Sequence, residues 1–325
     1  MIVPPASLPR FSWENLKVND DLGRVEGVVS ESAVRAHAFA IGDNPDRYLR
    51  GLDGGPCVPP SLLVNDLLKM VLLGYDGSNG AYGGLHTKAV IDYLAPLGIG
   101  ERVTVTGTHV AKYVRKGRRY RTLLSQAVRH DGLVIARLLA TETVLYDVTD
   151  RPDEGDIPKH WASHLPHVEG RLPDGDALRA RPGQALAEGM VLGPIARDVS
   201  IEQSVVFSGY PFSWAQEKPM AVRQSLHTNP DVARKAGYPA PVAQGMLCAS
   251  HHTSLLLDHF GPRVTQGAQL ALSFVSPILV GTTLHSHALV DEEVNAGGTR
   301  FTGLRVATRN ADGQLVAAGH ARVPA

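Results

Sequence analysis

The chain contains two long apolar segments. Each is followed by stretches in which apolar and polar residues alternate. The segments PPSLLVNDLLKMVLLG (residues 59–74) and AQGMLCASHHTSLLLDHFG (residues 243–261) are mostly apolar. A helix that is apolar around most of its circumference is buried on nearly every side. Alternation with a period of two is typical of strands that bury one face. Each half therefore predicts one long buried helix followed by about three strands, which is an α+β pattern.

The order of these elements is repeated along the chain. The segment VVSESAVRAHAF (28–39) matches DVSIEQSVVF (198–207), and Ser30 corresponds to Ser200 at an offset of 170 residues. Each serine is a candidate N-cap of a short helix, and Gln203 completes a capping box in the second copy. Repetition of elements in a constant order indicates an internal duplication.

The duplication continues through the strands at a larger offset. Pro96 matches Pro277, and the hairpin-turn dipeptides Asp131–Gly132 and Asp312–Gly313 match as well, all at an offset of 181 residues. The second copy therefore carries 11 more residues than the first between the capping serine and the hairpin. The segment SLHTNPDVARKAGYPAPVAQGM (225–246) lies in this interval, which marks it as the place where the halves differ most.

A segment rich in proline, glycine and charge separates the two copies. We interpret residues 149–189 as a surface linker, residues 1–148 as the N-terminal domain and residues 190–325 as the C-terminal domain. A chain of 325 residues is long for a single core and sufficient for two.

The charge balance gives no reason to expect a polyanionic partner. The chain has 32 Lys and Arg residues against 32 Asp and Glu residues, so no net field attracts nucleic acid or an anionic membrane. One local basic run, RKGRRYR (115–121), has two interpretations. It either contacts a phosphate of a nucleotide or phosphopantetheine group, or it is a solvated hairpin end.

Features of targeting and redox chemistry favour an intracellular protein. The N-terminus, MIVPPASLPRF, lacks the positive start and apolar core of an export signal. The apolar runs are shorter than the ~20 residues that a membrane span needs. The two cysteines, Cys57 and Cys248, form neither a metal-binding spacing nor a disulfide framework, which favours the reducing cytoplasm.

Segments in both halves resemble one family. In the second half these are HTNPDVARKAGYPAPVAQGM (227–246) and GAQLALSFVSPILVGTTL (267–284), and in the first half AFAIGDNPDRY (38–48) and LHTKAVIDYLAPLGIGERVTVTG (85–107). The chain resembles the MaoC-like (R)-specific enoyl-thioester hydratases and dehydratases in their double-hotdog form. The resemblance covers about residues 12–148 and 190–323.

The resemblance implies both a fold and an activity. In a hotdog an antiparallel sheet wraps around a long central helix, and in the double form two such sheets pair edge to edge with the active site at their junction. The implied enzyme is a carbon–oxygen lyase that hydrates 2-enoyl thioesters or dehydrates 3-hydroxyacyl thioesters held by CoA or a carrier protein. No metal and no other cofactor is implied, and the N-terminal half would accommodate the acyl group. The resemblance is also compatible with a homodimer.

The resemblance also assigns catalytic positions. His227 matches the catalytic histidine, which would act as general base and acid. Gly245 matches the glycine that opens the central helix, and its N–H would stabilise the thioester oxygen. Gln244 stands where the family commonly has histidine, and we assign it with Tyr210 to substrate binding.

The aspartate that the family pairs with this histidine is missing. It would lie five residues before His227, at a position that Val222 occupies. Gln224 and Ser213 are our first candidates to orient a water molecule in its place; Gln216 and Glu217 are further candidates.

The first half shows the opposite pattern. Asp43 and Asn44 are present, whereas Arg47 occupies the position that we match to the histidine. We assign Asp43 and Asn44 to substrate binding, with an Asx turn before Pro45 as the favoured alternative.

Simpler interpretations remain open for the other candidates. His227 could be a turn histidine bonded to nearby backbone, and the role of Gly245 depends on that of His227. A metal site at His251, His252 and His259 is disfavoured, because no acidic or cysteine partner lies at ligand spacing. For the whole protein, the alternatives are a repurposed hotdog enzyme (thioester hydrolase or conjugate-addition cyclase) and a non-catalytic acyl-binding subunit.

Overall fold

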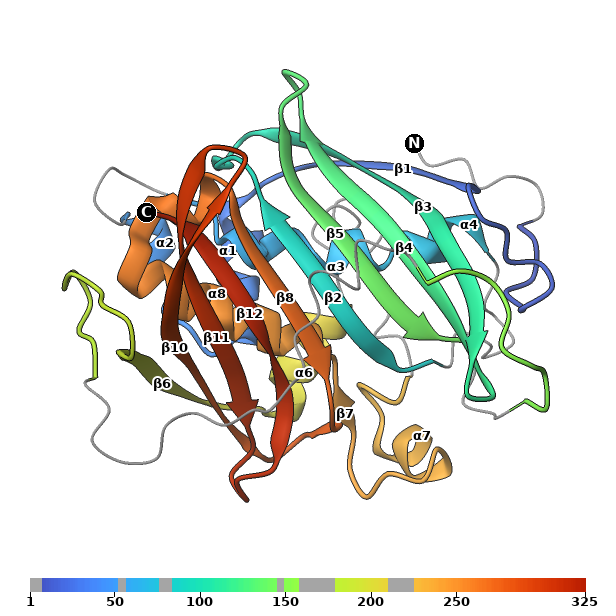
Figure 1. Cartoon of the computed structure of the whole chain (residues 1–325). Helices are drawn as coiled ribbons and strands as arrows, with labels where there is room; N and C mark the ends of the chain where they lie inside the picture. Colours follow the sequence, from blue (N-terminus) through green and yellow to red (C-terminus); the bar gives the residue numbers. More distant parts are fainter. Residues whose placement is uncertain (1–7, 52–56, 76–83, 145–148, 158–178, 210–224) are drawn as a thin grey trace.

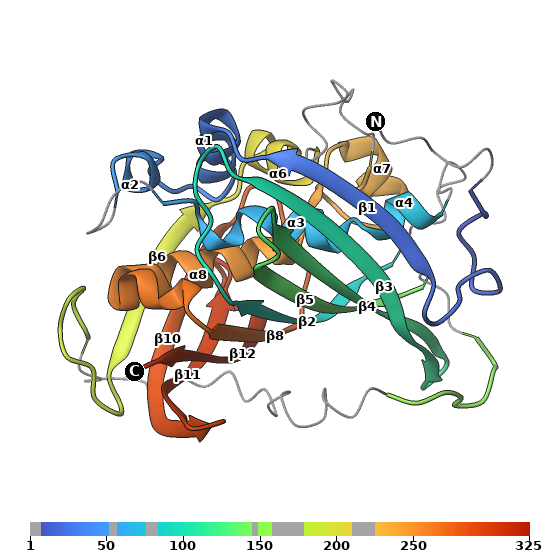
Figure 2. The ribbon, with the colours of Figure 1, turned by 90° about the horizontal axis from the view of Figure 1, so that it is seen from above.

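The two halves of the chain share one continuous antiparallel sheet. The computed structural model describes residues 8–51, 57–75, 84–144, 149–157, 179–209 and 225–325. Within these residues ten strands pair in the order β1-β3-β4-β5-β2-β8-β12-β11-β10-β6. The sheet curves around the helices, which lie on its inner side (Figures 1 and 2).

The N-terminal half contributes one edge of the sheet and the first set of helices. Its elements are β1 (Asp21–Val28), α1 (Glu31–Ala40), α2 (Asp46–Leu49), the 3-10 helix η1 (Pro60–Leu63), α3 (Val64–Leu68), α4 (Val71–Gly74), β2 (His86–Tyr93), β3 (Arg102–Arg115), β4 (Arg118–Arg129) and β5 (Val134–Thr143).

The C-terminal half repeats this order and adds a small insertion. Its elements are β6 (Val191–Asp198), α6 (Ile201–Gly209), α7 (Pro230–Lys235), β7 (Val242–Ala243), α8 (Met246–Phe260), the 3-10 helix η2 (Gly261–Thr265), β8 (Ala268–Phe274), β9 (Ile278–Leu279), β10 (Thr283–Ala296), β11 (Thr299–Arg309) and β12 (Leu315–Pro324). α7 has the place in this order that α2 has in the first half, whereas the short strands β7 and β9 have no counterpart among the described elements of that half and pair with each other outside the large sheet.

The halves meet where β2 pairs with β8, at the middle of the sheet. On either side of this junction the strands follow in matching order, β5-β4-β3-β1 and β12-β11-β10-β6. The predicted duplication and the double-hotdog fold are therefore confirmed. Four strands of the large sheet follow the central helix in each half, one more than the alternation pattern predicts. The limits of the two domains and of the linker stay predictions.

Short-range signals in the sequence form the predicted local structures. The Ser30 hydroxyl accepts a hydrogen bond from the N–H of Ala33 and caps α1. Ser200 and Gln203 bond reciprocally through side chain and backbone, which completes the capping box of α6. The dipeptides Asp131–Gly132 and Asp312–Gly313 lie at the tips of the β4–β5 and β11–β12 hairpins, where both glycines have positive φ.

The central helix of the N-terminal half differs from the prediction of one continuous helix. It runs as η1, α3 and α4 in series, with a break at Lys69 and Met70. The Ser125 hydroxyl of β4 donates a hydrogen bond of 2.7 Å to the carbonyl oxygen of Leu67. A side chain that takes a carbonyl out of the helical ladder interrupts the helix. The corresponding helix of the second half, α8, is continuous over 15 residues.

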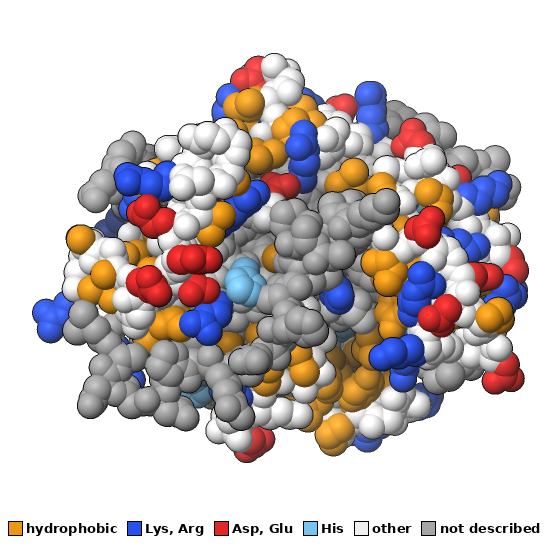
Figure 3. Space-filling model, viewed as in Figure 1, with side chains coloured by type: hydrophobic (Ala, Val, Ile, Leu, Met, Phe, Trp, Pro, Cys, Tyr) orange, Lys and Arg blue, Asp and Glu red, His pale blue; other side chains and the backbone are white. Residues whose placement is uncertain are grey.

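One hydrophobic core extends through both halves between the sheet and the helices. It contains Leu67 and Met70 from the N-terminal half and Leu255 and Leu256 from α8. Among the described residues no helix is both long and apolar enough to cross a membrane. Acidic and basic side chains are interspersed over the face of the molecule shown in Figure 3, in keeping with the balanced composition.

Candidate active site at the tip of α8

His227 lies in the turn before α7 and points toward the strand that leads into α8. Its Nδ1 is 2.5 Å from the carbonyl oxygen of Val242, three residues before Gly245. Its own carbonyl accepts a hydrogen bond of 2.8 Å from the Ser204 hydroxyl of α6. The backbone of His227 is thus held by α6 and its imidazole by the strand that leads into the central helix.

The contact with Val242 fixes the tautomer of the ring. A carbonyl oxygen only accepts, so Nδ1 must carry the proton and Nε2 is left as the basic nitrogen. Burial lowers the pKa of His227 below its ordinary value, and the hydrogen bond to the Val242 carbonyl raises it. The charge of Lys69 lowers this pKa, and the charge of Glu142 raises it. The net shift is downward. The imidazole is therefore neutral near pH 7, which is the state that a general base needs.

Gly245 is the N-cap of α8, as predicted from the sequence. The first backbone bonds of the helix begin with the N–H of Leu247 donating to the carbonyl of Gln244, so the Gly245 N–H precedes the ladder. A Cβ atom at Gly245 would lie 2.9 Å from Cδ1 of Phe274, closer than side chains tolerate. Glycine is therefore required here by the close approach of an aromatic ring.

Gln244 precedes the tip of the helix. Its Oε1 is buried and has no hydrogen-bond partner within the described parts of the chain. An unsatisfied buried oxygen costs roughly 1–3 kcal/mol, so a donor from a ligand would be stabilised at this position. The location agrees with the predicted role in substrate binding, which remains a prediction.

The N-terminal half adds charged residues that the sequence did not single out. The Lys69 ammonium donates to the carbonyl of Ser208 at the end of α6, and its charge acts on His227. Glu142, near the end of β5, also acts on His227 and forms a buried ion pair with Arg121. Nothing in the order of residues along the chain places these side chains near His227, because the contacts cross the junction of the halves.

Asp43 lies in a network that joins the halves. Its carboxylate accepts hydrogen bonds of 2.6 Å from the Tyr48 hydroxyl and 2.5 Å from the Ser254 hydroxyl of α8. The guanidinium groups of Arg47 and Arg197 lie 3.2 and 3.4 Å from it. Burial alone would raise the pKa of Asp43, but the hydrogen bonds from Ser254 and Tyr48 and the charge of Arg47 outweigh burial and lower it.

These contacts bear on two interpretations of the first half. Five residues after Asp43 stands Tyr48, so the match of Arg47 to the histidine position is wrong by one residue. Asn44 accepts a hydrogen bond of 3.0 Å from the N–H of Asp46, which is the Asx turn that we favoured before Pro45. Binding of substrate by Asp43 and Asn44 stays a prediction, and both side chains have structural partners.

Several predicted positions lie outside the described residues. These are Tyr210, Ser213, Gln216, Glu217, Val222 and Gln224. Their assignments stay predictions.

Two of the three histidines of α8, His251 and His252, lie in the core, and His259 is half-buried near the end of the helix. His252 Nε2 is 3.0 Å from the Thr308 hydroxyl of β11, and the rings of His251 and His252 are buried. We attributed these histidines to a helix flanked by polar loops, whereas α8 is buried along most of its length. Among the described residues no group of three His, Cys, Asp or Glu side chains could hold a metal ion.

The basic run 115–121 forms the end of the β3–β4 hairpin, with Lys116 and Gly117 at its turn. Arg118 is exposed, while Arg121 is buried and paired with Glu142. The run therefore divides into a solvated tip and one buried cation.

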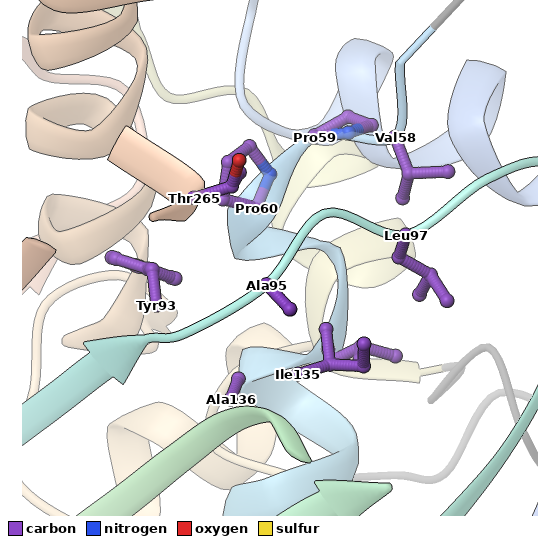
Figure 4. Close-up of a pocket in the computed structure, with 10 residues that line it drawn as sticks. Val58, Pro59, Pro60, Tyr93, Ala95, Leu97, Ile135, Ala136 and Thr265 are labelled. Atoms are coloured by element: carbon purple, nitrogen blue, oxygen red, sulfur yellow. The ribbon is translucent and has the colours of Figure 1, made fainter. Parts of the chain in front are cut away.

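A small hollow lies between η1 and the ends of β2 and β5 (Figure 4). It is lined by Val58, Pro59, Pro60, Leu63, Tyr93, Ala95, Leu97, Ile135, Ala136 and Thr265. It has room for about one water molecule, which is too little for an acyl chain.

Comparison with known proteins agrees with this arrangement. Residues 199–309 match the family model of the MaoC-like domain. The C-terminal half holds a MaoC-like domain. The matched range contains both His227 and Gly245, and the resemblance to this family is confirmed. A search of curated proteins gives no match.

Solved structures of MaoC-like proteins have the same fold over their whole length. A MaoC-domain dehydratase from Chloroflexus aurantiacus superposes with a TM-score of 0.67 at 13% identity, covering 98% of each chain. A MaoC-like dehydratase from Phytophthora capsici gives 0.63 at 16% identity, covering 94% of this chain and 96% of that one. A conserved Mycobacterium tuberculosis protein described as a double hotdog gives 0.58 at 14% identity, covering 97% of each chain.

Proposed function

We propose that the protein hydrates 2-enoyl thioesters and dehydrates the corresponding 3-hydroxyacyl thioesters. The observation that carries the proposal is the bond between His227 and the Val242 carbonyl. It fixes a neutral imidazole, with its basic nitrogen available, beside the N-terminus of α8. The match of this region to the MaoC-like domain supports the same reaction.

Each group has a defined part in hydration. His227 Nε2 takes a proton from water as the water oxygen adds to the β-carbon of the substrate. Electron density moves to the thioester oxygen, which receives a hydrogen bond from the Gly245 N–H at the positive end of the helix dipole. Protonation of the α-carbon completes the addition, and dehydration follows the reverse path.

The proposal extends to the form of the substrate and the place of the reaction. The acyl group would be carried by CoA or an acyl-carrier protein and would be accommodated by the N-terminal half. Cys57 and Cys248 are not joined by a disulfide, which supports a reducing compartment such as the cytoplasm.

Hydration is tested directly with purified protein and a panel of enoyl-CoA thioesters that includes crotonyl-CoA and branched analogues. We expect a loss of enoyl absorbance with formation of the 3-hydroxyacyl product. His227→Ala and His227→Gln should each lower kcat/KM by about 10²–10⁴-fold, because the acid–base group is lost. The control His130→Gln changes an exposed histidine at the β4–β5 turn and should have the wild-type rate.

Other outcomes would replace the proposal. Release of free CoA without hydration would identify a thioester hydrolase. Tight binding of acyl thioesters without either reaction would identify an acyl-binding subunit. A loss of less than tenfold in both His227 variants would remove this residue from the mechanism.

A further inference from the structure

A row of polar side chains lies on the inner face of the sheet beside the candidate site. His86 of β2 is the cross-strand partner of Glu142 of β5, and Glu142 is the partner of Arg121 of β4. Direct partners in an antiparallel sheet point to the same face. Glu142 lies four residues after Leu138 and two after Ala140 on β5, so it shares the face of these core residues, which is the inner one.

An irregularity in β2 directs His86 to that face. The register between β2 and β5 shifts between His86 and Lys88, so His86 pairs with Glu142 and Lys88 pairs with Thr141. A bulge changes the direction of a side chain and is frequent next to active sites. Without the shift, His86 would share the outward direction of Lys88.

A chain of contacts connects His86 with the tip of α8. The ring centroids of His86 and Phe274 are 4.6 Å apart. The Phe274 ring in turn occupies the space where a side chain of Gly245 would begin. His86 is therefore one aromatic ring away from the N–H that we assign to the thioester oxygen.

The ring nitrogens of His86 are buried, and no side chain of the described residues bonds to them; the Lys88 backbone is the group that acts on the ring as a hydrogen-bond partner. The Oε1 of Gln244 is buried and has no hydrogen-bond partner within the described residues. Leaving such groups unpaired costs roughly 1–3 kcal/mol each, and a bound polar ligand would recover this free energy. The unsatisfied atoms thus point to a polar ligand next to Phe274.

Glu142 is held in place and acts electrostatically on both imidazoles. It forms its ion pair with Arg121, whose Nη1 lies 3.2 Å from His109 Nε2. Burial lowers the pKa of His86. The charge of Glu142 and a hydrogen bond with the Lys88 backbone raise this pKa, and the charge of Arg121 lowers it. The same carboxylate raises the pKa of His227.

We propose that His86 is a second acid–base residue of this site, supplied by the N-terminal half where the C-terminal half lacks the aspartate, and that Glu142 is its positioning residue. This inference rests on the proposed hydratase function. His227 takes one proton of the water whose oxygen adds to the β-carbon and becomes an imidazolium. That proton passes from His227 to His86, and the His86 imidazolium then gives a proton to the α-carbon as the thioester C=O bond re-forms. Both rings end neutral, and no imidazolate forms.

The test combines three changes in this row with one control. His86→Phe keeps an aromatic ring against Phe274 but removes the nitrogens, and His86→Gln keeps polarity without basicity. Glu142→Gln removes the charge, and the double variant Arg121→Met with Glu142→Gln avoids leaving a buried cation unpaired. The control is again His130→Gln. Thermal unfolding and the Kd for a saturated acyl-CoA establish that each variant folds and binds.

We expect both His86 variants to bind the saturated thioester with less than threefold change while kcat falls by about 10²-fold. Glu142→Gln should lower kcat by about tenfold and move the acid limb of the kcat/KM profile to lower pH, because loss of the negative charge lowers the pKa of both imidazoles. The double variant should retain the loss in kcat with nearly wild-type stability.

Two negative results are distinguishable. If wild type hydrates enoyl thioesters and His227→Ala abolishes the reaction, but His86→Phe stays within threefold and the Glu142→Gln profile is unshifted, the role of His86 is refuted and the proposed function stands. If wild type hydrates no thioester of the panel, the proposed function fails, and the role of His86 fails with it.

Discussion

The Ser254 hydroxyl of α8 donates a hydrogen bond of 2.5 Å to the carboxylate of Asp43, which comes from the other half of the molecule. The same acid accepts from Tyr48 and pairs with Arg47 and Arg197. An acidic residue that the sequence assigns to substrate binding thus joins the two hotdogs. The carboxylate of Asp43 thus has its partners within the protein itself.

Replacing Asp43 should therefore affect stability more than chemistry. We expect Asp43→Asn to lower the free energy of unfolding by about 2–4 kcal/mol, because Arg197 loses its carboxylate partner and Arg47 keeps only Asp258. Urea denaturation measures the effect. The control Asp312→Asn, at an exposed hairpin turn, should change it by less than about 0.5 kcal/mol. A stable Asp43→Asn protein would show that the network contributes little.

A side chain at Gly245 should disturb the tip of α8. We expect Gly245→Ala to cost about 1–3 kcal/mol and to lower kcat, because its Cβ would collide with Phe274 and displace the helix N-terminus. Combining it with Phe274→Leu removes the collision and should recover most of the stability. Thermal unfolding of both variants checks this, and an unchanged Gly245→Ala protein would contradict the close contact.

The buried histidines should make the fold sensitive to acid. Burial lowers the pKa to about 3 for His251 and His252 and to about 4 for His37. Between these values and the ordinary 6.5, the unfolded chain binds protons that the folded chain does not. Stability should therefore be complete above pH 6.5 and fall as the pH drops toward 4.

The contribution of His252 to this pH dependence of stability can be measured with a single substitution. His252→Gln keeps a partner for Thr308 and should reduce the pH dependence by up to about 1.4 kcal/mol per pH unit in that window. Urea midpoints at pH 7.5, 6.0 and 5.0 give the slope for wild type, for this variant and for His130→Gln, which should match wild type. Equal slopes in all three proteins would exclude His252 as a contributor.

The break in the N-terminal central helix should depend on Ser125. We expect Ser125→Ala to lower the free energy of unfolding by about 1–3 kcal/mol, because the buried Leu67 carbonyl loses its donor. Urea denaturation measures this, with Ser276→Ala, which removes a surface bond to Gln314, as the control. Equal stabilities would indicate that the carbonyl finds a donor within the helix.

Local signals explain what could be predicted about the fold. The caps at Ser30 and Ser200 and the turns at Asp131–Gly132 and Asp312–Gly313 depend on contacts a few residues long. The interruption at Lys69 was not predictable in the same way, because Ser125 comes from a strand 58 residues away from Leu67.

The residues of the candidate site also differ in whether a local signal or a distant contact brings them to the site. His227 and Gly245 could be found in the sequence because both lie in one segment that matches the family. His86 and Glu142 could not, since they are 56 residues apart and meet only through a bulge in the strand pairing.

The sequence by itself determined the duplicated order of elements, the turns and caps that bound them, and the segment that presents His227 to the tip of α8. These features arise from hydrophobic periodicity and short-range hydrogen bonding. Only the tertiary structure decided which charges of the first half lie near that histidine. Strand register and the β2–β8 junction bring together residues that share no local pattern.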